Sequence, residues 1–160
     1  MPIKNDGDLI RAAGYVAIYS AYVEEAIEEI ITEMQRLDAT IDEKIFRQQI
    51  SQQIKFIKKW CLDHQLLGGQ LVGFDHFLDS LSILINQRNE IIHGRIYSVP
   101  GSNDVLKPAR RASEKKVADP AEVYKLANDL FEVIASLNTV SMFRLARYRS
   151  PYMALNLLKY

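Results

Sequence analysis

Apolar residues that recur every three or four positions are the feature of this sequence that most restricts its fold. This spacing places side chains on one face of an α-helix, and it is sustained over residues 9–34. Asp6 or Asp8 precedes the run and can cap the free backbone N–H groups of a first helical turn. The spacing therefore predicts a long amphipathic helix from about Asp8 into the thirties.

Three further segments show helical spacing. A looser apolar stripe predicts a second helix over residues 42–64, and the two glycines at 68–69 break it. A denser stripe predicts a third helix from residue 74 to near Gly94, because glycine is typical just past a helix C-terminus. The Asp-Pro pair at 119–120 is typical of a helix start and predicts the last long helix.

The segment between the third and fourth helices has a different character. Residues 96–99 contain three apolar side chains, a turn-rich stretch follows at 100–104, and Val105 and Leu106 come next. This pattern predicts a short β-hairpin or an ordered loop before the last long helix. The sequence as a whole predicts an all-α protein, a four-helix bundle that forms a single domain over residues 1–160.

Charge and cysteine content exclude several classes of protein. The chain has 20 basic and 20 acidic residues, so no global field attracts nucleic acid or a membrane. Residues 51–116 carry ten basic and six acidic side chains, and a polyanion contact is expected there rather than elsewhere. Cys61 is the only cysteine, so an intramolecular disulfide is impossible and a cytoplasmic protein is expected. The N-terminus has no apolar signal region and no run approaches the roughly 20 residues that span a bilayer, so no membrane partner is expected.

Few side chains suggest metal or nucleophilic chemistry. His64, His76 and His93 are not accompanied by other ligands at metal-site spacing, so we expect no metal and no cofactor. Cys61 and His64 are three residues apart, as in a reactive pair, but Cys61 lies in an apolar stripe and inert packing is favoured. The glycines at 68–69 lack the strand and the lysine of a phosphate-binding loop.

One charged residue interrupts the apolar stripe of the third helix. On a helical wheel with about 100° per residue, the apolar side chains of residues 74–96 share one arc, and Arg88 lies near its middle. A charge in that position is costly unless it is paired or used. Arg88 could form a buried ion pair with Glu24 or Glu25 of the first helix, or it could serve an anionic ligand.

Asn89 and His93 extend the polar interruption. They are four residues apart, so they lie on adjacent turns of the helix. His93 could simply cap the helix C-terminus, where the helix dipole favours a cation. Together with Arg88, the two residues form a polar wedge at the border of an apolar face. Arginine fits phosphate and histidine titrates near neutral pH, so the wedge is a candidate site for phosphate chemistry.

The stretch "RNEIIHG", residues 88–94, resembles the Arg-Asn-x-x-x-His motif of HEPN domains, the higher-eukaryote and prokaryote nucleotide-binding superfamily. Residues 14–31, "GYVAIYSAYVEEAIEEII", are similar to the first helix of many HEPN proteins, in which an apolar stripe with aromatic residues precedes glutamates. The motif also lies late in the third long helix, as it does in the family. The resemblance covers about residues 8–145 and implies a four-helix bundle of HEPN type.

The resemblance implies a metal-independent endoribonuclease, often a toxin or an antiviral defence effector that can have an antitoxin protein as partner. Two protomers would form a homodimer in which both motifs face one cleft and cleave RNA by attack of its 2′-hydroxyl. Arg88 would hold the scissile phosphate, His93 would act as general acid or base, and Asn89 would orient the site. A dimer supplies two histidines, one for each proton transfer.

One branch of the family, paired with nucleotidyltransferases, has a tyrosine two residues after the motif histidine. Here that position is Arg95 and the nearest tyrosine is Tyr97, so silencing by nucleotide transfer to tyrosine is not expected. Arg95 could contact phosphate or remain a solvated cation at the helix end. Lys107, Arg110 and Arg111 could bind the RNA backbone with salt-dependent affinity, or could belong to a mobile charged loop.

Two other functions stay open at this stage. The chain could be a non-catalytic HEPN-fold module that binds RNA or a nucleotide, or that serves in assembly. It could also be a plain four-helix interaction protein in which Arg88 is a structural ion pair. In the last case, removing Arg88 would unfold the chain, and removing His93 would change little.

Overall fold

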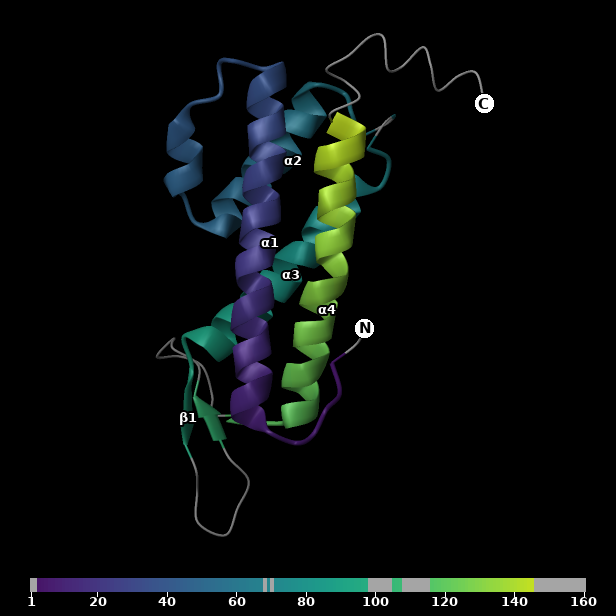
Figure 1. The fold of residues 1–160 in the computed structure, drawn as a ribbon. Helices are drawn as coiled ribbons and strands as arrows, with labels where there is room; N and C mark the ends of the chain where they lie inside the picture. Colours follow the sequence, from purple (N-terminus) through teal and green to yellow (C-terminus); the bar gives the residue numbers. More distant parts are fainter. Residues whose placement is uncertain (1–2, 68, 70, 98–104, 108–115, 146–160) are drawn as a thin grey trace, which may run out of the picture. The chain divides into compact units, whose positions relative to one another are not determined.

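The computed structural model describes residues 3–67, 69, 71–97, 105–107 and 116–145 (Figure 1). These residues form a mostly helical fold with a short antiparallel sheet before the last long helix, as the sequence predicts. The elements in chain order are α1 (Leu9–Leu37), the 3-10 helix η1 (Glu43–Arg47), α2 (Ile50–Asp63), α3 (Phe74–Ile92), β1 (Arg95–Tyr97), β2 (Val105–Lys107), β3 (Lys116–Val117), α4 (Pro120–Thr139) and the π-helix η2 (Val140–Leu145). None of the helices in these ranges combines the length and the apolar character that crossing a bilayer requires.

The chain divides into two compact units. The first contains residues 1–22 and 83–132, and the second contains residues 23–82 and 133–160. Helices α1, α3 and α4 each contribute residues to both units. The two units are therefore described one at a time, and a single domain over the whole chain stays a prediction.

The core of the first unit uses the apolar stripes that the sequence predicts for α1 and α4. Burying one large aliphatic side chain stabilises a fold by about 1.5–3 kcal/mol, so these stripes hold the unit together. The buried apolar residues of this unit are Leu9, Ala12, Val16, Ile85, Leu106, Ala118, Val123, Tyr124, Leu126, Ala127 and Leu130.

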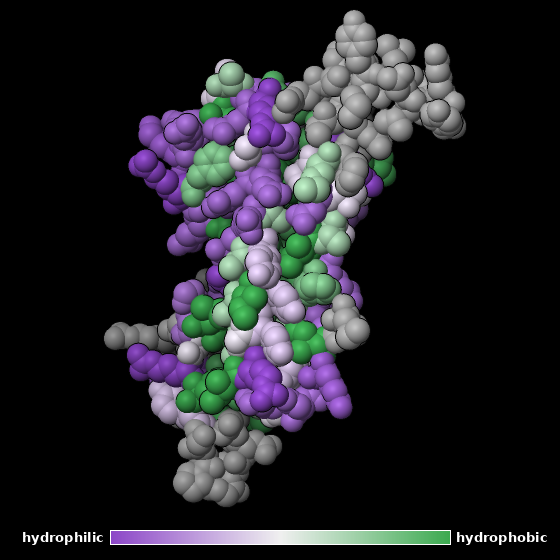
Figure 2. Space-filling model, in the orientation of Figure 1, coloured by the Kyte–Doolittle hydropathy of each residue, from purple (hydrophilic) through white to green (hydrophobic). Residues whose placement is uncertain are grey.

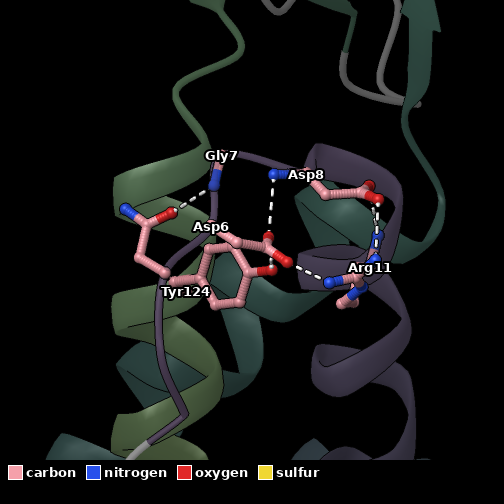
Figure 3. A network of polar contacts seen from close by, with 6 residues as sticks. Asp6, Gly7, Asp8, Arg11 and Tyr124 are labelled. Atoms are coloured by element: carbon pink, nitrogen blue, oxygen red, sulfur yellow. Dashed lines mark hydrogen bonds and ion pairs between the residues drawn. The ribbon is translucent and has the colours of Figure 1, made fainter.

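A polar network fastens the N-terminal segment to α4 in the first unit (Figure 3). The hydroxyl of Tyr124, on α4, donates to Asp6 Oδ1 at 2.6 Å, and Arg11 of α1 forms an ion pair with the same carboxylate. The hydrogen bond from Tyr124 lowers the pKa of Asp6, and the same bond raises the pKa of Tyr124 to about 12. Asp8 is the helix cap, since its Oδ1 accepts from the backbone N–H of Arg11 at 2.9 Å. The two aspartates that the sequence offered as caps thus have different roles.

The first half of α1 has an exposed face without charge. Residues 12–23 contain no charged side chain, and Ile18 and Tyr22 are about half exposed. Figure 2 shows near-neutral and hydrophobic side chains along this part of the helix. An exposed apolar face of this kind often marks a surface that a partner covers.

In the second unit, the prediction of one helix over residues 42–64 is wrong. The segment forms η1 and then α2, with Gln48 and Gln49 in extended conformation between them. The buried side chain of Gln53, in the first turn of α2, donates to the backbone oxygen of Ile45 at 3.3 Å. The same carbonyl also accepts the backbone N–H of Gln48 at 3.1 Å, so the end of η1 has one backbone and one side-chain donor.

The end of α2 carries a second polar cluster. The indole Nε1 of Trp60 donates to Asp38 Oδ2 at 3.2 Å, and the His64 ring stacks on Trp60 with ring centres 4.0 Å apart. Hydrogen bonds from Thr40 and then from Trp60 lower the pKa of Asp38. Cys61 is fully buried, and burial raises the pKa of its thiol to about 12. The interpretation of Cys61 as an inert packing residue agrees with this environment.

Candidate functional site

Helix α3 ends where a strand comes close to its last turn. The backbone N–H of His93 donates to the carbonyl of Asn89 at 3.2 Å, and the chain then enters β1. A Cβ on Gly94 would lie 2.3 Å from the backbone oxygen of Glu90 and 2.7 Å from Leu106 Cδ1. The glycine at this helix end is therefore required because a side chain would overlap first the carbonyl of Glu90 in α3 and then Leu106 of β2, and not because the backbone turns left-handed.

This close approach corrects one sequence assignment. The helical wheel placed Ile96 on the apolar arc of the third helix, but Ile96 lies in β1, in register with Leu106 of β2. The helix stops at Ile92, so the arc ends there. The motif residues Arg88 and Asn89 remain helical, and the motif histidine is the first residue beyond the helix.

The structure brings Arg88 and Asn89 together. Arg88 Nη1 donates to Asn89 Oδ1 at 2.9 Å, and both residues are half-buried. The Nε atom of Arg88 is buried as well. This hydrogen bond helps to hold the guanidinium in a defined orientation. Asn89 thus orients the arginine directly, whereas the resemblance implies only that Asn89 orients the site as a whole.

His93 is exposed at the helix end. Within the described part of the chain its ring makes no hydrogen bond, ion pair or ring contact. The backbone bond to Asn89 fixes the position of its Cα one turn beyond Asn89, but the ring is not joined to the other two motif residues. The structure therefore places all three motif residues at one end of α3 and connects only two of them through side chains.

Two of the predicted RNA-binding cations face each other in the sheet. Arg95 of β1 pairs in register with Lys107 of β2, and both side chains are exposed. Like charges directly opposite each other destabilise an antiparallel pair, so an anion bound between them would remove a cost. The other two predicted cations, Arg110 and Arg111, lie outside the described residues. The register of these short strands is not specified by the amino-acid pattern, so this pairing could not be predicted.

The opposite side of the α3 end has the reverse charge. A cavity of about 400 Å³ is lined by Gln87, Glu90 and Ile91 of α3, together with residues of α4 and the sheet. At about 100° per residue, Ile91 and Asn89 point about 160° apart on the helix. The charged residues that line the cavity are Glu90, Asp119, Glu122, Lys125 and Asp129, and Lys125 pairs with Asp129 at 2.6 Å. Arg88 and Ile91, in contrast, point only about 60° apart. The acidic cavity disfavours a polyanion, and Asn89 is the motif residue that faces away from it.

No group of three or more His, Cys, Asp or Glu side chains suited to a metal ion occurs among the residues that the structure describes. Comparison of the chain with protein-family models, with curated proteins and with solved structures found no significant match. The function of the chain is therefore inferred from the geometry of the site and from the motif.

Proposed function

We propose that this protein is a metal-independent endoribonuclease of HEPN type that acts as a homodimer. The observation that carries the proposal is the end of α3. There, a half-buried arginine oriented by an asparagine precedes an exposed histidine by one and a half turns. An arginine and a histidine suffice for RNA cleavage, since RNA carries its own nucleophile.

The reaction needs two proton transfers and one stabilised charge. A base removes the proton of the 2′-hydroxyl, and the 2′-oxygen forms a bond to the adjacent phosphorus. The bond from phosphorus to the 5′-oxygen breaks, and an acid donates a proton to that leaving oxygen. The products are a 2′,3′-cyclic phosphate and a 5′-hydroxyl end. Arg88 would stabilise the charge that develops on the phosphate oxygens, and His93 would transfer protons.

A second protomer would supply the second histidine. One ring cannot readily act as base and acid in the same concerted step, and a two-fold dimer offers two. The uncharged exposed face on the first half of α1 supports association, because it lies in the same unit as the motif. The proposal includes a toxin or defence role with an antitoxin protein as partner, which the resemblance to HEPN domains implies.

The test is cleavage of total RNA and of tRNA by the purified chain in EDTA. The wild type is expected to cut in the chelator and to leave 5′-hydroxyl ends, and His93→Ala is expected to cut at least a hundredfold more slowly. An oligonucleotide with a single 2′-deoxy position at a mapped cleavage site should resist cutting there. Metal-dependent cutting, or equal rates for the wild type and His93→Ala, would refute the proposal.

A non-catalytic RNA-binding module is the second candidate. The pairing of Arg95 with Lys107 favours it, because these two cations can hold phosphate without any chemistry. The same samples separate the two functions. Salt-dependent retention of RNA by a chain that leaves the RNA intact would identify the binding module.

A further inference from the structure

The short sheet presents one face of mixed aromatic and basic character. Successive side chains of a strand alternate between faces, so Arg95 and Tyr97 share a face of β1. Their partners in register, Lys107 and Val105 of β2, lie on that same face. Val117 of β3, which pairs with Val105 and is 61% exposed, continues the surface to the edge of the sheet, where it also borders the acidic cavity.

We propose that this face, formed by Arg95, Tyr97, Val105, Lys107 and Val117, is a platform for single-stranded RNA. One base stacks on the ring of Tyr97, and an adjacent phosphate lies between Arg95 and Lys107. The inference depends on the proposed function for the choice of RNA, and it adds a single-strand requirement and a base-stacking residue.

The other face of the sheet is already used. Ile96 and Leu106 point away from the platform and line the acidic cavity, where Leu106 is buried. Tyr97, in contrast, is 43% exposed and makes no ring contact within the described residues. An exposed aromatic ring beside two cations matches the way single strands are bound, by stacking on aromatic rings and by basic side chains along the backbone.

Spacing also favours a single strand. Arg95 and Tyr97 are about 7 Å apart along β1, and the Cβ atoms of Arg95 and Lys107 are about 5 Å apart across the sheet. Both cations can thus reach one phosphate while the ring contacts the neighbouring base. A duplex would hide its base faces inside the helix, so the ring would have nothing to stack on.

The platform begins two residues after His93. A strand whose backbone is held at Arg95 is therefore delivered to the histidine at the end of α3, and RNA bound on the platform has its next phosphates near the motif. The acidic cavity on the other side of α3 keeps the strand from the alternative path.

Binding is measured by fluorescence anisotropy of a labelled uridine homopolymer on full-length His93→Ala protein, which should not consume the probe. Adding Tyr97→Ala is expected to weaken binding roughly five- to a hundredfold, the range for loss of one stacked base. Tyr97→Phe should bind like the parent, because the ring remains. Phe131→Ala is the matched control, since Phe131 is 41% exposed but lies on α4.

The salt dependence tests the two cations. Each contact to a phosphate of a single strand contributes about 0.7 to the slope of log affinity against log salt. Arg95→Gln and Lys107→Gln are each expected to reduce the slope by about that amount, while Lys44→Gln, an exposed cation of the second unit, should leave it unchanged. A duplex of the same length should bind more weakly and should not respond to Tyr97→Ala.

A cross-linking experiment covers the case in which a substitution disturbs folding. Single-stranded RNA with 5-iodouridine is irradiated on the chain with an intact platform, and the cross-linked peptide is expected to contain Tyr97. Parental affinity in Tyr97→Ala, an equal loss in Phe131→Ala, or cross-links only elsewhere would overturn the platform. Tyr97-dependent binding by a chain that never cleaves would overturn the catalytic proposal and leave the platform standing. Cleavage by the wild type together with parental affinity in Tyr97→Ala would overturn the platform and leave the catalytic proposal standing.

Discussion

Two histidines lie just past the C-termini of helices, one in each unit, and their environments differ. His64, after α2, stacks on Trp60, and its Nδ1 lies 2.9 Å from the backbone oxygen of Trp60. Both residues are exposed, but the ring of His93, after α3, has no such contact within the described residues. The helix dipole favours a cation at both positions, so the dipole alone does not explain the difference.

The comparison separates a structural histidine from a candidate catalytic one. The ring of His64 packs on Trp60, so removing it should lower the free energy of unfolding. His93 follows an arginine and an asparagine, and its ring has no hydrogen bond or ring contact within the described residues, so removing it should lower the rate of RNA cleavage.

The matched variants His93→Ala and His64→Ala should have opposite effects on the rate of RNA cleavage and on stability. His93→Ala is expected to lower the rate of RNA cleavage by a factor of about 10² to 10⁴, as loss of a general acid or base does, with little change in the free energy of unfolding. His64→Ala should retain full activity and lose roughly 1 kcal/mol of stability, because an aromatic contact is removed. Cleavage assays and urea denaturation of both variants measure this. A loss of activity in His64→Ala equal to that in His93→Ala would remove the distinction.

A second pair of variants tests how the end of α3 is held. Gly94→Ala is expected to destabilise the chain by about 1–3 kcal/mol, because its Cβ would overlap Glu90 and Leu106. Gly14→Ala is the control, since a Cβ there meets nothing within 4 Å and helix propensity favours alanine by about 1 kcal/mol. Denaturation midpoints and cleavage rates should fall together for Gly94→Ala only. Equal stability of the two variants would show that β2 does not approach Gly94 as described.

Helical spacing accounts for most of the predicted fold. The stripe from Leu9 to Met34 and the Asp119-Pro120 start predict α1 and α4 closely, because both depend on local periodicity and caps. The split into η1 and α2 could not be predicted, because the extended backbone of Gln48 and Gln49 between them has no periodic signature. The bond from the Gln53 side chain to the carbonyl of Ile45 is not predicted by helical spacing either.

The candidate site was predictable as a set of residues but not as an arrangement. Arg88 was noticed because a charge interrupts an apolar arc, and the motif added Asn89 and His93. The pairing of Arg95 with Lys107 depends on strand register, which short strands without a tight-turn signal do not specify. Tyr97 does not lie at the position where one branch of the family has its tyrosine, which is Arg95 here. The sequence alone did not indicate that the Tyr97 ring is exposed on the same sheet face as Arg95 and Lys107.

The third prediction concerns the pH dependence of the second unit. The folded chain lowers the pKa of Asp38 below its ordinary value of 3.8. Its carboxylate therefore stabilises the folded state above that value, and the stabilisation disappears as the pH falls through the lower folded-state pKa. Asp38→Asn should reduce stability near neutral pH and flatten its decline in acid. Denaturation of the wild type and of Asp38→Asn between pH 2 and pH 7 measures the effect, and parallel curves would contradict it.

The smallest effect is optical, and it sharpens the comparison without any change in activity. Trp60 is the only tryptophan, and the His64 ring lies on its face, so Trp60 emission reports on this cluster alone. Removing a ring that is stacked on the indole changes the environment of the fluorophore, so His64→Ala is expected to shift the wavelength or the intensity of Trp60 emission. His93→Ala is expected to leave the emission as in the wild type, because the ring contact of Trp60 among the described residues is with His64. Equal spectral changes in the two variants would remove the division into a structural and a candidate catalytic histidine.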